Sequence, residues 1–407
     1  MCEITRANSV TCYIIPPDIL QNIVRKGSAK ARDLAFHALE VSAQIRGQRQ
    51  VLNAIAMLGG QPGVKRRTVY DAQNGTDLPG TQVRGEGDPE SGDAAADEAY
   101  DNSGKTYDFY LKVFNRNSLD NQGMGLDSSV HYDSSYNNAF WNGEQMVYGD
   151  GDGVIFTGFT SAIEVVAHEL THGITSHEAK LVYQDQSGAL NEHFSDVFGA
   201  LVAQFYLQQD AASADWLIGK GILGPRIRGV ALRSMKAPGT AYNDSVLGKD
   251  PQPAHMKSFV KTNRDFGGVH TNSGIPNKAF FNVAISLGGN AWDKPGHIWY
   301  KTLIGELAPN ASFQDCADGT TRVARSLYDN GVAQQVAAAW SAVGVAPSAA
   351  ATAAQVAVPA PPAAGAPAAA GAAGGAGAGK AGAGTAGAKR PPTKKAGAKK
   401  PGSKRPR

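Results

Sequence analysis

The chain has 407 residues, of which 42% are hydrophobic and 18% charged, so it can bury a large core and is predicted to hold two domains with appendages. No apolar run approaches the roughly 18 residues of a membrane-spanning helix, and three cysteines are too few for a disulfide framework. Ten of the 39 Lys and Arg residues lie in 380–407 without an acid, so the rest of the chain, with 29 basic and 36 acidic residues, is mildly acidic.

Residues 1–58 are predicted to be an appendage rather than the start of a catalytic body. They contain Pro16 and Pro17 followed by the apolar pair Ile19 and Leu20, and then an amphipathic helical stretch from residue 29 to about 57. Two prolines before an apolar pair make a rigid element that presents apolar side chains for docking. The alternative is a plain N-terminal helix packed on the domain.

Residues 59–175 are predicted to form a β-rich domain. Short β-prone pieces at 67–70, 106–114, 129–132 and 145–148 alternate with Gly, Asn and Asp turns, which is typical of an antiparallel sheet. The acidic stretch 84–104 is expected to be a loop that leads into a short helix. Residues 149–153, Gly-Asp-Gly-Asp-Gly, lack the twelve-residue calcium pattern, so a turn is favoured over a cation site.

One stretch of this region, 161–178, carries the motif H-E-x-x-H and is predicted to be a helix that Ser161 begins with a capping box. Residues four apart lie on one helix face, so His168 and His172 can present two imidazoles to a single Zn²⁺ ion. Glu169 is rotated by about 100° and is placed to act on a zinc-bound water. By itself the motif also occurs on ordinary solvated helices.

A second helix is predicted to supply the third zinc ligand. Glu192 follows His172 by twenty residues in the stretch 188–199, where apolar residues recur at the spacing of a buried helix. A carboxylate in such surroundings is costly unless it is paired or bound to a metal, so Glu192 is predicted to be the ligand. Asp196 and Asn191 are predicted to support the ligand side chains. The alternative is a pair of surface helices with ordinary charges.

Residues 176–345 are predicted to form a helical second domain. Helical patterns cover 191–207, 279–287, 291–307, 313–330 and 332–343. With the helix 161–178 bridging the two domains, the substrate cleft is expected between them.

Residues 346–407 are predicted to be a disordered tail, because they are rich in Ala, Pro and Gly and end in a Lys-rich stretch. Its cations could bind polyanions in a salt-dependent manner. The alternative is a solubilising tail without a partner.

The motifs HELTH at 168–172 and NExxSDxFG at 191–199 resemble those of the thermolysin-like neutral metallopeptidases. The resemblance runs from about residue 70 to 345 and includes YNNAFWN at 136–142, LRSM at 232–235 and GGVHTNSG at 267–274. It implies an α+β, two-domain fold with a β-rich N-terminal domain and a helical C-terminal domain joined by the zinc helix. It also implies a zinc endopeptidase.

The resemblance implies roles for four residues around the zinc. His270 matches the donor to the oxyanion that forms during peptide hydrolysis, and Asp265 matches the residue that orients its ring and keeps it protonated. Tyr183 matches a second donor. Arg233 matches the arginine that holds a substrate backbone carbonyl. Without the resemblance His270 would be read as an ordinary loop histidine.

The resemblance also implies where a peptide substrate binds. Asn138 and Ala139 lie on a predicted edge strand to which an extended peptide can pair by strand addition. Four residues match the walls of the pocket for the side chain after the scissile bond and imply a preference for bulky apolar residues there: Phe156, Phe159, Val165 and Leu232.

The N-terminal segment is similar to the short propeptides with a P-P-x-x-L motif in the protealysin-like branch of this family. This similarity implies a segment that covers the cleft as an inhibitor and is later clipped by the enzyme itself. Plausible cleavage points lie near apolar residues at 51–57: Val51, Leu52, Ile55 and Met57.

Ca²⁺ is a possible second cofactor. Glu164 and Asp215 match positions of the family's paired calcium site, but Leu217 and Lys220 stand where calcium-binding relatives have acids. A lysine ammonium can replace the charge of a cation. The paired site is therefore doubtful, and weak calcium dependence is expected.

The sequence thus predicts a monomeric zinc endopeptidase with peptide or protein substrates. Because no secretory signal is visible, secretion by a non-classical route is expected, with a cytoplasmic location as the alternative. A different class of function is a polyanion-binding protein with an inactive peptidase-like body. A zinc aminopeptidase is disfavoured because no acidic pocket motif is present to hold a free amine.

Overall fold

The computed structural model describes residues 12–52 and 64–353, with side chains described for 13–43 and 64–353. These residues belong to one compact unit, Met1–Gln355. The predicted cleavage points Val51, Leu52, Ile55 and Met57, and the tail beyond residue 353, lie outside the described side chains.

A six-stranded sheet forms the N-terminal part of the body, in the order β1-β5-β6-β4-β2-β3. Its strands are β1 (Cys12–Tyr13), β2 (Arg67–Asp71), β3 (Thr81–Gly85), β4 (Leu126–Val130), β5 (Ala139–Trp141) and β6 (Met146–Tyr148). The prediction of a purely antiparallel sheet is wrong, because β4 pairs in parallel with both β2 and β6. A long crossover containing a helix separates β3 from β4, which is the kind of connection that parallel pairing requires.

That crossover helix, α3 (Ala94–Phe114), corrects the predicted strand at 106–114. The Asp93 side chain caps its start by accepting from the Ala96 N–H, and Asn115 ends it in a left-handed conformation. Buried aromatic residues, including Phe109 and Tyr110, lie along the helix. Their β propensity suggested a strand, but their burial within a packed helix decides the outcome.

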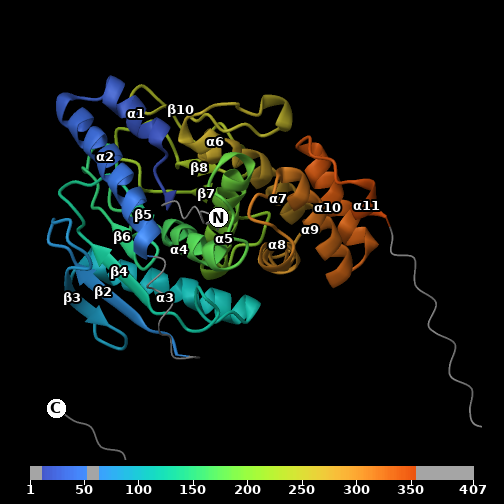
Figure 1. Ribbon diagram of the computed structural model, residues 1–407, viewed down its shortest axis with the longest axis horizontal. Coiled ribbons are helices and arrows are strands. Elements are labelled where there is room, and N and C mark those ends of the chain that lie inside the picture. Colours follow the sequence, from blue (N-terminus) through green and yellow to red (C-terminus); the bar gives the residue numbers. More distant parts are fainter. Residues whose placement is uncertain (1–11, 53–63, 354–407) are drawn as a thin grey trace, which may run out of the picture. The chain divides into compact units, whose positions relative to one another are not determined.

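The helices α4 (Ile163–His177) and α5 (Asp185–Leu207) pack against each other in the middle of the body (Figure 1). The zinc helix is therefore present, but its predicted capping box is not. Ala162 occupies the N-cap position and no side chain caps the first turn, so Ser161 does not begin the helix.

The C-terminal part is helical, as predicted. It contains α6 (Asp265–Asn272), α7 (Gly274–Leu287), α8 (Lys294–Gly305), α9 (Phe313–Leu327), α10 (Asn330–Ala342) and α11 (Ala349–Thr352), and a 3-10 helix, η1 (Met256–Ser258). Two small sheets lie between α5 and α6: β7 (Leu217–Ile218) with β8 (Arg233–Ser234), and β9 (Asn243–Asp244) with β10 (Gly248–Lys249). The ends of the predicted helices agree with these to within three residues, except that α5 and α7 begin six and five residues before their predicted starts.

The N-terminal segment forms β1, α1 (Pro17–Lys26) and α2 (Ala29–Leu52), and it docks on the body as the two prolines predicted. Pro16 is the N-cap of α1 and Pro17 is its first residue, a position where a missing N–H is tolerated. The apolar residues Ile19, Leu20 and Ile23 of α1 are buried. None of the helices described for 12–52 and 64–353 is long and apolar enough to cross a membrane.

Candidate active site

Three side chains from α4 and α5 meet at one point. The Nε2 atoms of His168 and His172 lie 3.1 Å apart, and each lies 3.5 Å from a carboxylate oxygen of Glu192. Zinc bonds of about 2.0–2.2 Å at tetrahedral angles place ligand atoms about 3.3–3.5 Å apart. All three side chains are at most 1% exposed, and their chemistry suits Zn²⁺. The three residues therefore fit a zinc ion with a fourth position open.

Helix geometry and close packing bring these ligands together. His168 and His172 stand one turn apart on α4, and Glu192 projects from α5. A side chain on Gly199 of α5 would lie 2.6 Å from the backbone oxygen of Glu164 on α4. Glycine at this position thus allows the two backbones to approach closely.

The other nitrogen of each imidazole is held by a residue predicted for that purpose. Asp196 lies 2.9 Å from His168 Nδ1, and the Asn191 side-chain oxygen lies 2.8 Å from His172 Nδ1. Arg233 donates two parallel hydrogen bonds to Asp196, from Nη2 to Oδ1 over 2.9 Å and from Nε to Oδ2 over 3.0 Å. Burial opposes ionisation of Asp196, but Arg233 and His168 outweigh it and lower the pKa of Asp196 to about 2. Asp196 is therefore a carboxylate that orients one ligand ring.

Behind Asp196 lies a chain of hydrogen bonds that the sequence analysis missed. The Trp299 indole donates to His193 Nε2 over 2.7 Å, and His193 Nδ1 donates to the side-chain oxygen of Asn277 over 2.7 Å. The Asn277 amide then donates to Asp196 over 2.8 Å. Because an indole N–H can only donate, Nε2 of His193 is the acceptor and its proton is on Nδ1. His193 next to Glu192 was the available signal, but nothing in the sequence linked it to Asn277.

Glu169 lies on α4 between the two imidazoles and is completely buried. Burial raises the pKa of Glu169 to about 8, against the opposing charge of His168 and with the added repulsion of Glu192. A carboxyl group with a raised pKa beside a metal site is suited to accepting and returning a proton near neutral pH.

His270, Asp265 and Tyr183 meet on the α6 side of the metal site. His270 Nδ1 donates to Asp265 over 2.6 Å, and its Nε2 lies 3.5 Å from Glu192. The Tyr183 hydroxyl donates to Glu192 and lies 3.2 Å from His270 Nε2. Burial alone would lower the pKa of His270, but Asp265 and Glu192 outweigh it and raise this pKa to about 9. The ring is therefore a protonated donor at neutral pH.

An unusual backbone turn delivers Asp265 to His270. Asp265, Phe266, Gly267 and Gly268 all have positive φ, between 49° and 87°. A side chain on Gly267 would collide with Asp185, so only glycine fits there. The left-handed region is strained for Asp265 and Phe266, and such strain concentrates at functional sites. The left-handed turn was not predicted.

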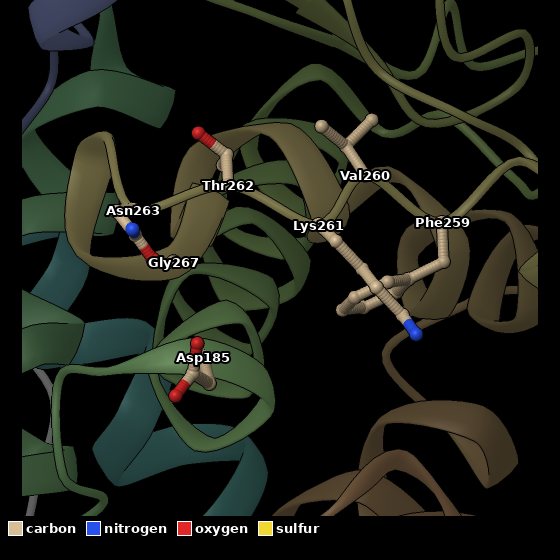
Figure 2. A pocket seen from close by; sticks show the side chains of 7 residues that line it. All are labelled: Asp185, Phe259, Val260, Lys261, Thr262, Asn263 and Gly267. Atoms are coloured by element: carbon tan, nitrogen blue, oxygen red, sulfur yellow. The ribbon is translucent and has the colours of Figure 1, made fainter.

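An open pocket of about 550 Å³ lies beside this turn (Figure 2). Its lining consists of Asp185, Phe259, Val260, Lys261, Thr262, Asn263 and Gly267. None of these residues belongs to the metal site or to the predicted peptide-binding positions.

Residues of the N-terminal segment occupy the predicted peptide-binding positions. The Ile14 N–H donates to the Ala139 carbonyl over 3.2 Å, and the Ile15 N–H donates to the Asn138 side-chain oxygen over 3.0 Å. Arg233, besides contacting Asp196, donates to the Ile14 carbonyl over 3.2 Å. All these groups are buried.

The predicted pocket walls are buried and lie in the same apolar cluster as the N-terminal residues Ile14 and Ile15. The four wall residues are at most 1% exposed: Phe156, Phe159, Val165 and Leu232. Phe140 and Trp141 are also buried, as expected for core residues next to Ala139.

The residues of the doubtful calcium site contact each other. Lys220 Nζ lies 2.7 Å from Asp215, and the Lys220 backbone N–H donates to Glu164 over 3.0 Å. Leu217 lies in β7 and brings no oxygen side chain. Lys220 thus contacts both acids that would bind the cation, Asp215 through its ammonium group and Glu164 through its backbone N–H.

Comparisons with known proteins place this site in a family. Residues 60–176 match the family model of the thermolysin metallopeptidase catalytic domain, and 179–345 match that of its alpha-helical domain. The chain is 50% identical over 342 residues to an extracellular metalloprotease of Pectobacterium carotovorum subsp. carotovorum, covering 82% of this chain and 96% of the relative. It is 48% identical over 339 residues to protease PrtS of Photorhabdus sp. (strain Az29), covering 82% and 91%.

Among solved structures, the chain is similar to the precursor of protealysin, a metalloproteinase from Serratia proteamaculans. The TM-score is 0.77 and the sequences are 53% identical, over 82% of this chain and 100% of that chain. The match confirms the predicted α+β, two-domain fold. Together with the metal site formed by His168, His172 and Glu192, these comparisons show that the chain belongs to the thermolysin metallopeptidase family and is a zinc metalloprotease.

Proposed function

We propose that this protease cleaves within peptide chains, with Glu169 as the general base and His270 and Tyr183 as donors to the developing oxyanion. The observation that carries the proposal is the buried meeting of Glu169, the three metal ligands and the protonated His270. Zinc supplies a Lewis acid that lowers the pKa of water towards about 7. Glu169 accepts the water proton and returns it to the leaving amine.

The remaining residues bind and orient the peptide. Ala139 and Asn138 offer main-chain and side-chain acceptors along an edge strand, so they bind backbone N–H groups of any sequence. Arg233 holds a backbone carbonyl and is itself fixed by Asp196. Residues on both sides of Tyr13, namely Cys12 and Ile14, pair with β5, which favours cleavage within a chain over removal of single N-terminal residues.

A bulky apolar residue is preferred directly after the scissile bond. Support comes from the burial of the apolar residues Phe156, Phe159 and Val165, and from the apolar side chain of Ile14, which is completely buried while the Ile14 carbonyl accepts from Arg233. Burying such a side chain stabilises the complex by about 1.5–3 kcal/mol. Peptides that differ only at this position should therefore differ in kcat/KM by one to two orders of magnitude.

The N-terminal segment acts as the protein's own inhibitor until it is removed by self-processing. Its residues Tyr13, Ile14 and Ile15 contact the residues proposed to bind substrate. While these three residues are bound there, a substrate peptide cannot bind to the same residues. The similar solved structure is that of a precursor, the precursor of protealysin, which agrees with this role.

Further proposals concern the parts of the chain outside the site. We propose the predicted borders 1–58, 59–175, 176–345 and 346–407, except that residues 346–353 with α11 belong to the body. The basic residues of 380–407 bind polyanions. The lysine contacts at Asp215 and Glu164 support weak calcium dependence. The enzyme acts as a secreted monomer, in agreement with the extracellular relative named above.

Metal removal tests the proposed function. A quenched apolar peptide is incubated with the processed enzyme, then with a chelator, and then with added Zn²⁺ or Ca²⁺. We expect chelation to abolish turnover, Zn²⁺ to restore it and Ca²⁺ alone to leave it absent. Release of single N-terminal residues instead of internal fragments would contradict endopeptidase action, and metal-independent turnover would contradict the zinc mechanism.

A further inference from the structure

The N-terminal segment enters the cleft as an extended strand. β1 pairs antiparallel with β5, with Cys12 opposite Trp141 and Tyr13 opposite Phe140. The pairing continues past β1 through the Ile14 N–H, which donates to the Ala139 carbonyl. The backbone of 12–15 is therefore held in a single register along the edge of the sheet.

This register places one carbonyl of the segment at the metal site. The Tyr13 carbonyl accepts from His270 Nε2 over 3.0 Å, and that nitrogen lies 3.5 Å from the metal ligand Glu192. The next carbonyl, that of Ile14, is turned to Arg233 instead. The carbonyl beside the oxyanion donor is thus that of Tyr13, and the peptide bond it belongs to joins Tyr13 to Ile14.

The direction of the segment is also that of a substrate. The chain runs from the Tyr13 carbonyl beside His270 to Ile14, whose carbonyl accepts from Arg233 and whose side chain is completely buried. The Ile15 N–H reaches Asn138 one residue further on. A strand that ran in the other direction would not bring two successive backbone N–H groups, like those of Ile14 and Ile15, to Ala139 and Asn138.

We propose that the Tyr13–Ile14 peptide bond is a self-cleavage site, hydrolysed by the metal centre of the same molecule. This inference rests on the proposed function. Water adds across the bond: a C–O bond forms at the Tyr13 carbonyl carbon, and the C–N bond to Ile14 breaks. Glu169 carries one water proton to the Ile14 nitrogen as the C–N bond breaks, and the water oxygen stays on the Tyr13 carbonyl carbon. The second water proton is released as the new acid ionises to a carboxylate, and it protonates the new Ile14 amine. The products are the peptide 1–13 and a chain that begins at Ile14.

Cutting this bond does not by itself clear the cleft. The helix α1, which follows, remains docked through buried Ile19, Leu20 and Ile23, and the Asn22 amide donates to the Leu247 carbonyl over 2.9 Å. The residues after Ile14 therefore stay in place as a bound product. Complete opening needs a second cut near the end of α2, so self-processing proceeds in two steps.

The test uses the full chain, prepared with a chelator and started by adding Zn²⁺. Intact-mass and peptide mass spectrometry follow the fragment 1–13. We expect it to form at a rate that does not change over about 100-fold dilution, because the reaction is intramolecular. The variant Ile14→Pro, which removes the N–H donated to Ala139, should slow its formation by at least about 10²-fold. The conservative Ile14→Val should retain it.

Two further measurements separate this inference from the proposed function. A foreign protease site placed within 53–63 frees the body, whose turnover of a small quenched peptide should be equal in the parent and the Ile14→Pro chain. In the Glu169→Gln chain, amide hydrogen exchange should show protected Ile14 and Ile15 N–H groups. An active body together with an intact Tyr13–Ile14 bond overturns the inference alone. A zinc-loaded body without peptide turnover overturns the proposed function and the inference with it.

Discussion

The two sides of the cleft are built in different ways. On the α4–α5 side, side chains fix side chains: Asp196 alone contacts His168, Arg233 and Asn277 within 3.1 Å. On the β5 side, Ala139 and Asn138 accept from backbone N–H groups of the bound segment, those of Ile14 and Ile15. The side-chain contacts on the α4–α5 side hold the metal ligands in one geometry. The backbone contacts on the β5 side can bind any extended peptide. The α4–α5 side therefore holds the catalytic groups in fixed positions, and the segment bound on the β5 side can be replaced by a substrate peptide.

The largest effect is expected from Glu169→Gln, which keeps the size of the side chain but removes its basicity. Turnover of a quenched peptide by the freed body should fall by about 10²–10⁴-fold, the usual contribution of general acid–base catalysis. Bound zinc, measured by elemental analysis, should remain unchanged because Glu169 is not a ligand. Retained turnover would show that the α4–α5 side does not supply the base.

The next effect concerns the charge that protonates His270. Asp265 raises the pKa of His270 to about 9, so the donor form is present below that pH and is lost as the pH rises through it. In Asp265→Asn this pKa should fall, moving the alkaline limb of the kcat profile to lower pH, with a loss of about 10²-fold at neutral pH. An alkaline limb at an unchanged pH would show that Asp265 does not raise the pKa of His270.

The hydrogen-bond chain behind Asp196 should affect the metal more weakly. Asn277→Leu keeps the volume but removes the donor to Asp196 and the acceptor of His193, and we expect zinc affinity to fall by about 10–100-fold. Competition with a chelating dye measures this affinity. Asn290→Leu, at a half-buried asparagine outside the metal site whose side chain donates to Asp293, is the control and should leave the zinc affinity unchanged. Equal zinc affinities for both variants would show that the hydrogen bonds behind Asp196 contribute to packing and not to metal binding.

The smallest effect is expected on the docking of the segment. Burial, together with the charge of Asp265, raises the pKa of Asp18 above its usual value. The docked state therefore favours protonated Asp18, and docking weakens as the pH rises through this raised pKa. Asp18→Asn should slow release of the segment a few-fold at neutral pH and not at acidic pH. Size-exclusion chromatography after cleavage within 53–63 measures the release, and a pH-independent difference would contradict the mechanism.

The features that could be predicted from the sequence divide in a similar way. Side chains at helical spacing could be predicted, and contacts between distant segments could not. Residues with side-chain chemistry at helical spacing, His168, His172 and Glu192, were predicted with their correct partners, since local periodicity determines which face they share. The parallel pairing of β4 was not, because strand order depends on contacts distant in sequence. The link from His193 to Asn277 was not either, since it spans 84 residues and two helices.

The N-terminal segment shows the same limit. Pro16 and Pro17 predicted a docking element, but which backbone atoms of Tyr13 and Ile14 meet His270 and Arg233 depends on the register of β1 on β5. Register is a property of the folded pair and not of either strand alone. The left-handed turn at Asp265 and Phe266 was likewise hidden, because the sequence indicated only its two glycines.

The most direct test is the coordination and stoichiometry of the metal in the freed, active enzyme. X-ray absorption spectroscopy, with elemental analysis, should find one zinc per chain with two imidazole nitrogens and one carboxylate at about 2.0–2.2 Å. The same sample should regain peptide turnover in proportion to zinc added to the metal-free protein. Turnover in a sample whose zinc has a different set of protein ligands would contradict the account.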